Sequence, residues 1–163
     1  MRVAPTFDEA FLKRQLGAVQ SLPSSGKVFI SVNDRDKEFV VPIARSYADL
    51  GFELLATRGT AKLLKEAGLN VQPVLKVHEG RPNIVDMIKN GEVAMVINTA
   101  SGKRTTHDSR AIRQTTLHYG VPFTTTISGA RAIARAIQHQ QNEALHVECL
   151  QDYYAGSPKG ERA

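Results

Sequence analysis

Cysteine, tryptophan and aromatic side chains are scarce in this chain, whose 163 residues include one cysteine, no tryptophan and only 6% aromatics. The lone Cys149 cannot form an internal disulfide, which is typical of a reducing cytoplasm. The longest apolar runs, such as residues 93–97, are far too short to cross a membrane. Asp8 and Glu9 lie where a signal peptide would need apolar residues. The sequence therefore predicts a cytoplasmic protein without membrane contact.

Runs of five or more like charges are also absent, although the net charge is +5. A basic balance suits either nucleic acid or an anionic small molecule. The basic residues between positions 76 and 113 are spread among expected loops, and aromatic residues are few. This pattern favours a pocket for an anion and argues against nucleic acid as a partner. The five histidines and one cysteine show no spacing typical of a metal site.

Short apolar runs alternate with helical patterns from residue 27 onward. Such alternation predicts an α/β fold, namely an open five-stranded parallel sheet with helices on both faces. Pro42 falls inside the second helix, which predicts a late start or a kink there. Residues 144–149 are a further candidate, for an edge strand. The expected strands span 27–31, 52–55, 71–75, 93–97 and 121–124, and the helices after them span 39–50, 60–68, 83–89, 105–118 and 128–138.

Residues 1–26 differ from the rest of the chain. Apolar residues at helical spacing over 7–20 are followed by a Pro/Ser/Gly-rich stretch at 22–26 that is typical of a linker. A helix and linker with no preceding partner element suggest the tail of a preceding domain. We therefore expect three parts: this tail at 1–26, a binding domain at 27–150, and a frayed tail at 151–163. The sequence leaves open whether the helix packs on the domain or mediates self-association into a homo-oligomer.

Ligands of open parallel sheets bind outside the carboxyl ends of the strands, so the loops there are the candidate sites. Thr57, Gly59 and Thr60 lie where a strand meets a helix, and hydroxyls and free N–H groups at such a point suit a phosphate. The alternative is an ordinary turn with Thr60 as the helix N-cap.

Two other loops carry suitable polar residues. Lys76 opens a loop with a His and an Arg at the end of the third strand, where cations would neutralise a phosphate. The alternative is a solvated loop in which Pro82 starts the next helix. Asn98 and Thr99 follow the most apolar strand, in a loop that is longer than usual for such connections.

The stretch 105–109 contains a Thr, a His, an Asp and a Ser but is not a catalytic triad. Consecutive residues point in different directions, whereas a triad is assembled from separate segments. Thr105 as N-cap with Asp108 three residues later resembles a capping box. Asp108 would still reach the crevice from that first helical turn.

Together these segments resemble a known family. Residues 31–37, 56–60, 76–82, 97–102 and 108–110 are similar to the C-terminal regulatory domain of the carbamoyl-phosphate synthase large chain, in the methylglyoxal-synthase-like group. The resemblance covers about residues 26–139. The leading helix resembles the end of the last ATP-binding domain of that synthase.

The resemblance implies an allosteric domain without catalytic residues that binds a nucleoside monophosphate, UMP or IMP. The parent ligase uses ATP with Mg or Mn in pyrimidine and arginine biosynthesis, and its partners are the rest of the large subunit and the glutaminase small subunit. The implied effector-binding residues are Lys37, Thr57, Gly59, Thr60 and Lys76 for the phosphate, Asn98, Thr99 and Asp108 for phosphate or ribose, and Val77, Ile84 and Ile112 for the base.

Two positions depart from the family pattern. Ala100 replaces a Thr, which removes one hydroxyl. Thr124 and Thr125 stand where the family senses ornithine with an Asp-Thr pair, and the missing carboxylate argues against ornithine sensing here.

The enzyme alternative is methylglyoxal synthase, a lyase that acts on dihydroxyacetone phosphate. Its chemistry needs a carboxylate base, a second acid and a His. Asp108 alone has a counterpart here: the key carboxylate falls near Gly80 and Arg81, and the His at Thr105, although His107 is close. Another relative, the IMP cyclohydrolase domain, has a Lys-Thr-Leu-His-Pro segment that this chain lacks. The sequence therefore favours a binding domain over a catalyst.

Overall fold

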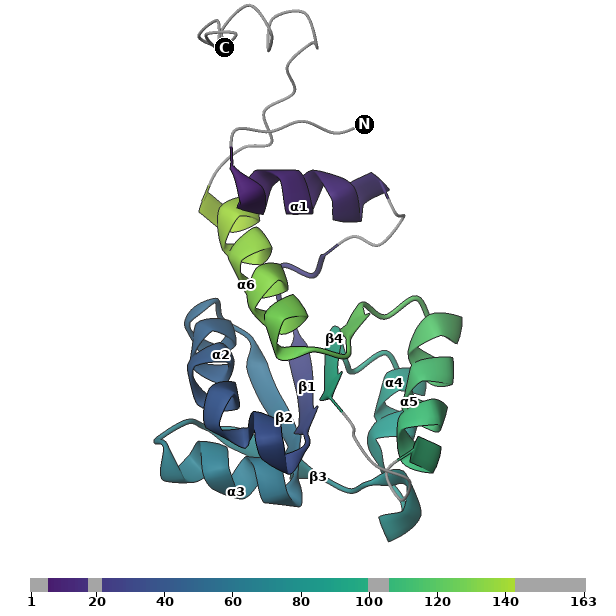
Figure 1. The fold of residues 1–163 in the computed structure, drawn as a ribbon. Coiled ribbons are helices and arrows are strands. Elements are labelled where there is room, and N and C mark those ends of the chain that lie inside the picture. The colour runs from purple at the N-terminus through teal and green to yellow at the C-terminus, as the bar shows by residue number, and fades with distance from the viewer. Residues whose placement is uncertain (1–5, 18–21, 100–105, 143–163) are drawn as a thin grey trace, which may run out of the picture.

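A single parallel sheet organises the chain in the computed structural model, which describes residues 6–17, 22–99 and 106–142 (Figure 1). Its five strands lie in the order β3-β2-β1-β4-β5, with every neighbouring pair parallel. The predicted open, five-stranded parallel α/β fold is confirmed. The strands are β1 (Lys27–Val32), β2 (Glu53–Thr57), β3 (Val71–Val74), β4 (Met95–Thr99) and β5 (Phe123–Thr124).

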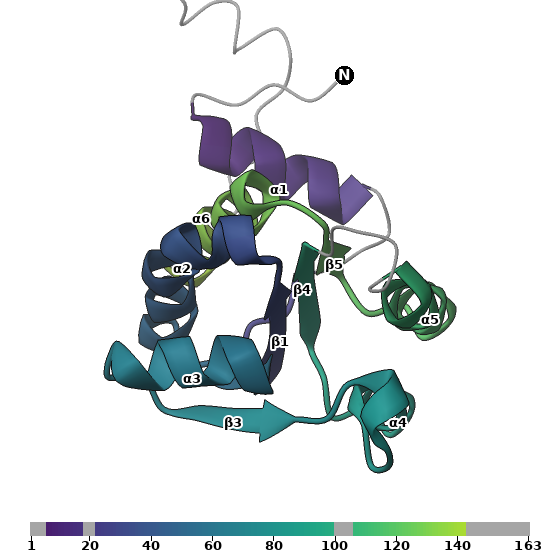
Figure 2. The same cartoon turned by 60° about the horizontal axis from the view of Figure 1, so that its bottom comes forward.

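Helices cover both faces of this sheet, as Figure 2 shows. α2, α3 and α6 lie on one face, and α4 and α5 lie on the other. Two short 3-10 turns, η1 and η2, follow β1 and β3. The bounds are α1 (Phe7–Gly17), η1 (Asp34–Asp36), α2 (Lys37–Asp49), α3 (Arg58–Glu66), η2 (Val77–Glu79), α4 (Ile84–Lys89), α5 (Thr106–His118) and α6 (Ile127–Asn142).

Alternating strand residues build two hydrophobic clusters, one on each face. In β1, Val28 and Ile30 join the cluster under α2, α3 and α6, whereas Phe29 joins the cluster under α4 and α5. All three are fully buried. Successive side chains of a strand point to opposite faces, so a strand buried on both sides is apolar throughout.

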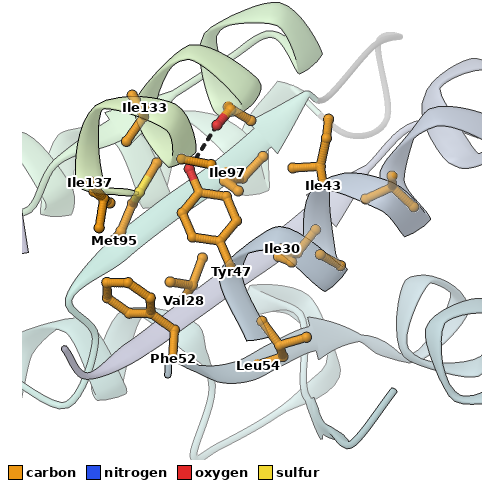
Figure 3. Close-up of a cluster of buried hydrophobic side chains, with 14 of the residues drawn as sticks. Val28, Ile30, Ile43, Tyr47, Phe52, Leu54, Met95, Ile97, Ile133 and Ile137 are labelled. Atoms are coloured by element: carbon orange, nitrogen blue, oxygen red, sulfur yellow. Dashed lines mark hydrogen bonds between the residues drawn. The ribbon is translucent and has the colours of Figure 1, made fainter. Parts of the chain in front are cut away.

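Tyr47 of α2 ties the helices of the larger cluster together (Figure 3). Its ring is fully buried, packs edge-on against Phe52 with ring centroids 5.9 Å apart, and donates its hydroxyl to the Ala130 carbonyl of α6 at 2.8 Å. Burial raises the pKa of Tyr47 far above its ordinary value, so the hydroxyl keeps its proton.

We expect Tyr47→Phe to lower the free energy of unfolding by about 1 kcal/mol. The effect is moderate because the ring packing is retained and the Ala130 carbonyl, inside α6, keeps its helical partner. Urea unfolding monitored by circular dichroism measures it. Tyr119→Phe, on an exposed side chain, is the control. Equal stability of the two variants would contradict the assigned bond.

The leading helix α1 packs on α6 of the same chain (Figure 1). Leu12 is buried in the larger cluster, and Arg135 donates to Asp8 through Nε at 3.1 Å and through Nη2 at 2.9 Å. Leu22, the first residue of the expected linker, is buried in the same cluster, whereas residues 24–26 are exposed.

Several predicted boundaries differ from the structure. The helix that contains Pro42 begins at Lys37, so a late start was wrong; Pro42 is its sixth residue, where the missing N–H removes the helical bond to the Glu38 carbonyl. Strands β2 and β4 run two residues further than predicted, to Thr57 and Thr99. Helix α6 continues to Asn142. The edge strand expected at 144–149, the tail after 151 and the cap Thr105 lie outside the described residues.

Candidate functional site

A pocket of about 340 Å³ opens at the carboxyl ends of the strands. It lies where the order of the sheet reverses between β1 and β4, the usual ligand position in such sheets. Ten of the eleven predicted effector-binding residues line it. The lining residues are Phe29, Ser31, Val32, Asn33, Asp34, Lys37, Thr57, Gly59, Thr60, Lys76, Val77, His78, Ile84, Asn98, Asp108, Ser109 and Ile112.

One wall is the first turn of α3. The helix begins at Arg58 with Thr57 as its N-cap, so the interpretation of Thr60 as the N-cap was wrong. The Thr57 side chain makes no capping bond; its hydroxyl lies 3.4 Å from that of Thr60, and both residues are buried. The first-turn N–H groups of a helix lack partners within the helix and carry its positive dipole end. This wall therefore presents donors for an anion.

Two lysines face the same space from different elements. A Cβ placed on Gly59 would lie 3.9 Å from Nζ of Lys37, so this ammonium sits above the first turn of α3. Lys76 is the N-cap of η2, and its own N–H donates to Oε2 of Glu79 at 2.9 Å. The pocket thus combines two cations with a helix N-terminus, an arrangement suited to a phosphate.

The loop after Lys76 ends differently from the solvated-loop alternative. Asn83, not Pro82, precedes the helix: it is the N-cap of α4 and accepts from the N–H of Val85 at 3.0 Å. The alternative with Pro82 as the first helical residue was wrong. The Asn83 cap fixes the end of the loop, and hence holds Ile84 in the wall of the pocket.

Asn98 lines the pocket from near the end of β4. It is 2% exposed, and its Nδ2 atom has no hydrogen-bond partner among the described residues. Buried donors are nearly always paired, so an unpaired donor on a pocket-lining residue is a candidate partner for a ligand acceptor.

Asp108 and His78 bridge the pocket. Oδ2 of Asp108, in the first turn of α5, lies 2.5 Å from Nδ1 of His78 in η2. The Asp108 side chain is 14% exposed and that of His78 is 64% exposed. The sequence identified His78 only as a loop cation; its partner comes from a segment thirty residues away.

The apolar side of the pocket is formed by Phe29, Val77, Ile84 and Ile112. Ile84 and Phe29 are fully buried, and Ile112 is 5% exposed. These side chains belong to the smaller cluster or pack against it. The pocket therefore has a cationic end and an apolar end, which suits a phosphate ester with a flat apolar group.

Three predicted residues lie away from this pocket. Thr99 turns toward Asn33, which donates its N–H to Oγ1 of Thr99 at 3.3 Å and its Nδ2 to the Thr99 carbonyl at 2.6 Å. Thr124 lies at the end of β5, where its hydroxyl donates to the Thr126 carbonyl at 3.4 Å, and Thr125 follows it.

Some lining residues escaped the sequence analysis as individual candidates. They are Phe29, Ser31, Val32, Asn33, Asp34 and Ser109. Ser31, Asn33 and Asp34 fall in the loop after the first strand, which strand order alone marks as a ligand loop. Their particular roles depend on contacts that the sequence does not give.

The pocket and sheet define an α/β domain with two lysines and a helix N-terminus at the carboxyl ends of its strands. A family model described as an MGS-like domain matches residues 39–125, more than half of the chain. The chain belongs to this family, as its motifs predicted.

Over nearly its whole length the chain is also similar to carbamoyl phosphate synthase large chains. It is 52% identical over 155 residues to that of Pasteurella multocida and 50% over 156 residues to that of Acidobacterium capsulatum, covering 94% and 96% of this chain. It spans only 14% of each relative's length. A "C-terminal section" of the large chain from Methanopyrus kandleri is 46% identical over 157 residues, or 96% of this chain and 29% of that protein.

Among solved structures, the crystal structure of ForH aligns with 71% of this chain and 90% of its own, at 17% identity and a TM-score of 0.43. No helix in the described part of the chain is long and apolar enough to cross a membrane. Within those same residues, no group of three His, Cys, Asp or Glu could hold a metal ion.

Proposed function

We propose that this chain is the effector-binding domain of a carbamoyl phosphate synthase large chain and binds a nucleoside monophosphate, UMP or IMP. The parent enzyme would be an ATP-dependent ligase that uses Mg or Mn, with the rest of the large chain and a glutaminase small subunit as partners. Similarity to such chains over nearly the full length supports the assignment.

The unpaired Nδ2 of Asn98 is the observation that carries this proposal. It is a buried donor of a residue that lines the pocket together with the two lysines and the apolar side chains. A nucleoside monophosphate has an acceptor for each region: its phosphate for Lys37, Lys76 and the α3 N-terminus, and its ribose or phosphate oxygens for Asn98. The base would lie against Val77, Ile84 and Ile112.

Regulation would follow from linkage between binding and conformation. An effector that prefers one arrangement of the whole synthase shifts catalysis elsewhere by a coupling free energy of typically about 1–3 kcal/mol. By this scheme the domain itself performs no chemistry.

One observation favours the alternative, a lyase that converts dihydroxyacetone phosphate to methylglyoxal and phosphate. The contact between His78 and Asp108 in the pocket is of the kind that acid–base enzymes use. However, the key carboxylate of that chemistry falls near Gly80 and Arg81 in this chain, and a guanidinium cannot act as the base.

Calorimetric titration of the chain with UMP, IMP and dihydroxyacetone phosphate separates these functions. We expect saturable binding of at least one nucleotide and no release of methylglyoxal or phosphate. Turnover of dihydroxyacetone phosphate, followed by a colorimetric assay of methylglyoxal, would overturn the regulatory assignment. The His78→Asn variant is the matched control, because a catalytic pair would lose turnover and a binding site would keep most of its affinity.

A further inference from the structure

An ion pair occupies the cationic end of the pocket. Nζ of Lys37 lies 2.6 Å from Oδ1 of Asp34, three residues earlier in η1. Both residues line the pocket. Lys37 is the same lysine whose ammonium lies above Gly59 at the start of α3. The Asp34 carboxylate therefore contacts a cation that the proposed phosphate would need.

Asp34 is free to leave this position. Its side chain is 93% exposed, whereas that of Lys37 is 38% exposed. An exposed ion pair of this kind is weak, because water solvates both partners when they separate. The carboxylate can thus swing into solvent while Lys37 stays at the pocket.

The charges around Asp34 come from both lysines of the pocket. The hydrogen bond and charge of Lys37 lower the pKa of Asp34 below its ordinary value, Lys76 lowers it further, and desolvation opposes them. Asp34 is therefore ionised at neutral pH, and its carboxylate contacts Lys37, one of the two cations that would hold a phosphate.

We propose that Asp34 is an internal counter-anion that a ligand phosphate displaces from Lys37, so that it sets how strongly the pocket selects a phosphate group. This inference rests on the proposed function. A dianionic phosphate interacts more strongly with the ammonium groups of Lys37 and Lys76 than a single carboxylate does. A neutral nucleoside has nothing with which to displace Asp34.

The test is the affinity of Asp34→Asn for UMP, IMP and inorganic phosphate, measured by calorimetry. The amide keeps the shape of the side chain and removes its charge. We expect each phosphate-bearing ligand that binds to bind about two- to fivefold more tightly, the range that follows from the strength of exposed ion pairs. Uridine or inosine binding should not change.

Glu38→Gln is the matched control for charge alone. Glu38 is exposed, lies one residue after Lys37 and does not line the pocket. The Glu38→Gln substitution changes the net charge by the same amount as Asp34→Asn. If both variants bind phosphate more tightly by the same factor, general electrostatics explain the gain and the inference is overturned.

A double-mutant cycle locates the effect at the ion pair. Asp34→Asn should tighten phosphate binding when Lys37 is present and should do so much less when Lys37→Met is present too. An equal gain in both backgrounds would overturn the inference.

The outcomes separate this inference from the proposed function. Nucleotide binding that Asp34→Asn leaves unchanged or weakens would overturn the role of Asp34 and leave the function standing. If inorganic phosphate binds but no nucleotide does, and Asp34→Asn tightens that binding, the proposed role of Asp34 is supported and the proposal of a nucleotide ligand is overturned. No binding of any phosphate to either protein at millimolar concentration would overturn both.

Discussion

Replacement of Lys76 by methionine is expected to weaken the binding of UMP or IMP by about 10- to 100-fold. A hydrogen bond to a charged group contributes about 1.5–3 kcal/mol, and each 1.4 kcal/mol corresponds to a tenfold change in affinity. Lys76 lines the pocket as the N-cap of η2, held there by the bond from its N–H to Glu79. Methionine retains the apolar stem and leaves that backbone bond in place. Calorimetric titration measures the loss.

Lys65→Met is the control for this prediction. Lys65 is exposed in the last turn of α3, at the other end of the helix from the pocket. The Lys65→Met substitution removes the same charge from the chain. The affinity of this variant for the nucleotide should therefore stay within about twofold of that of the parent chain if long-range effects are small. A Lys76→Met variant that binds as tightly as Lys65→Met would show that the phosphate does not use this end of the pocket.

The fold could be predicted from the sequence because the apolar runs, the helical patterns and the short connections between them all indicated the same architecture. Apolar runs buried on both faces alternated with amphipathic helices, and short connections then allow few topologies. The limits of the strands were less certain. The polar side chains of Thr57, Asn98 and Thr99 had suggested that these residues lie in loops. In the structure β2 continues to Thr57 and β4 continues to Thr99.

The convergence of the binding loops was predictable for the same reason. The carboxyl ends of parallel strands meet at one edge of the sheet, so Thr57, Lys76 and Asn98 were expected to lie together. Thr99 shows the limit of this argument. Adjacent strand residues point in opposite directions, so the pocket receives Asn98 while Thr99 bonds to Asn33.

The pairing of side chains at the site could not be predicted from the sequence. Asp34 lies three residues from Lys37, but the sequence does not say whether the carboxylate turns toward the lysine or toward water. His78 and Asp108 come from η2 and α5, which meet only in the folded chain. The packing of α1 on α6 likewise depends on Leu12 and Asp8 matching a surface that no local pattern reveals.

Asn98→Leu is expected to have opposite effects on stability and binding. Leucine has the same branching as asparagine but no polar atoms, and it would replace a buried donor that has no partner among the described residues. An unsatisfied buried donor destabilises the folded state by about 1–3 kcal/mol, so the ligand-free variant should gain free energy of unfolding within that range. Its affinity for the nucleotide should fall at least about tenfold, since the bond to the ligand is lost. Urea unfolding and calorimetry measure the two effects.

Asn98→Asp is the matched comparison for that variant. A carboxylate at this position keeps an acceptor, removes the donor and adds a buried charge that repels a phosphate. It should therefore lose both binding and stability, whereas Asn98→Leu loses binding alone. A less stable Asn98→Leu variant would mean that Nδ2 is already satisfied in the ligand-free protein. Because a ligand adds more stability to the protein that binds it more tightly, excess nucleotide should narrow or reverse the difference in free energy of unfolding between the parent chain and Asn98→Leu. That reversal would indicate that the Asn98 amide forms a hydrogen bond with the bound ligand. An unpaired buried donor destabilises the ligand-free protein, and the same donor stabilises the complex once the ligand accepts its hydrogen bond.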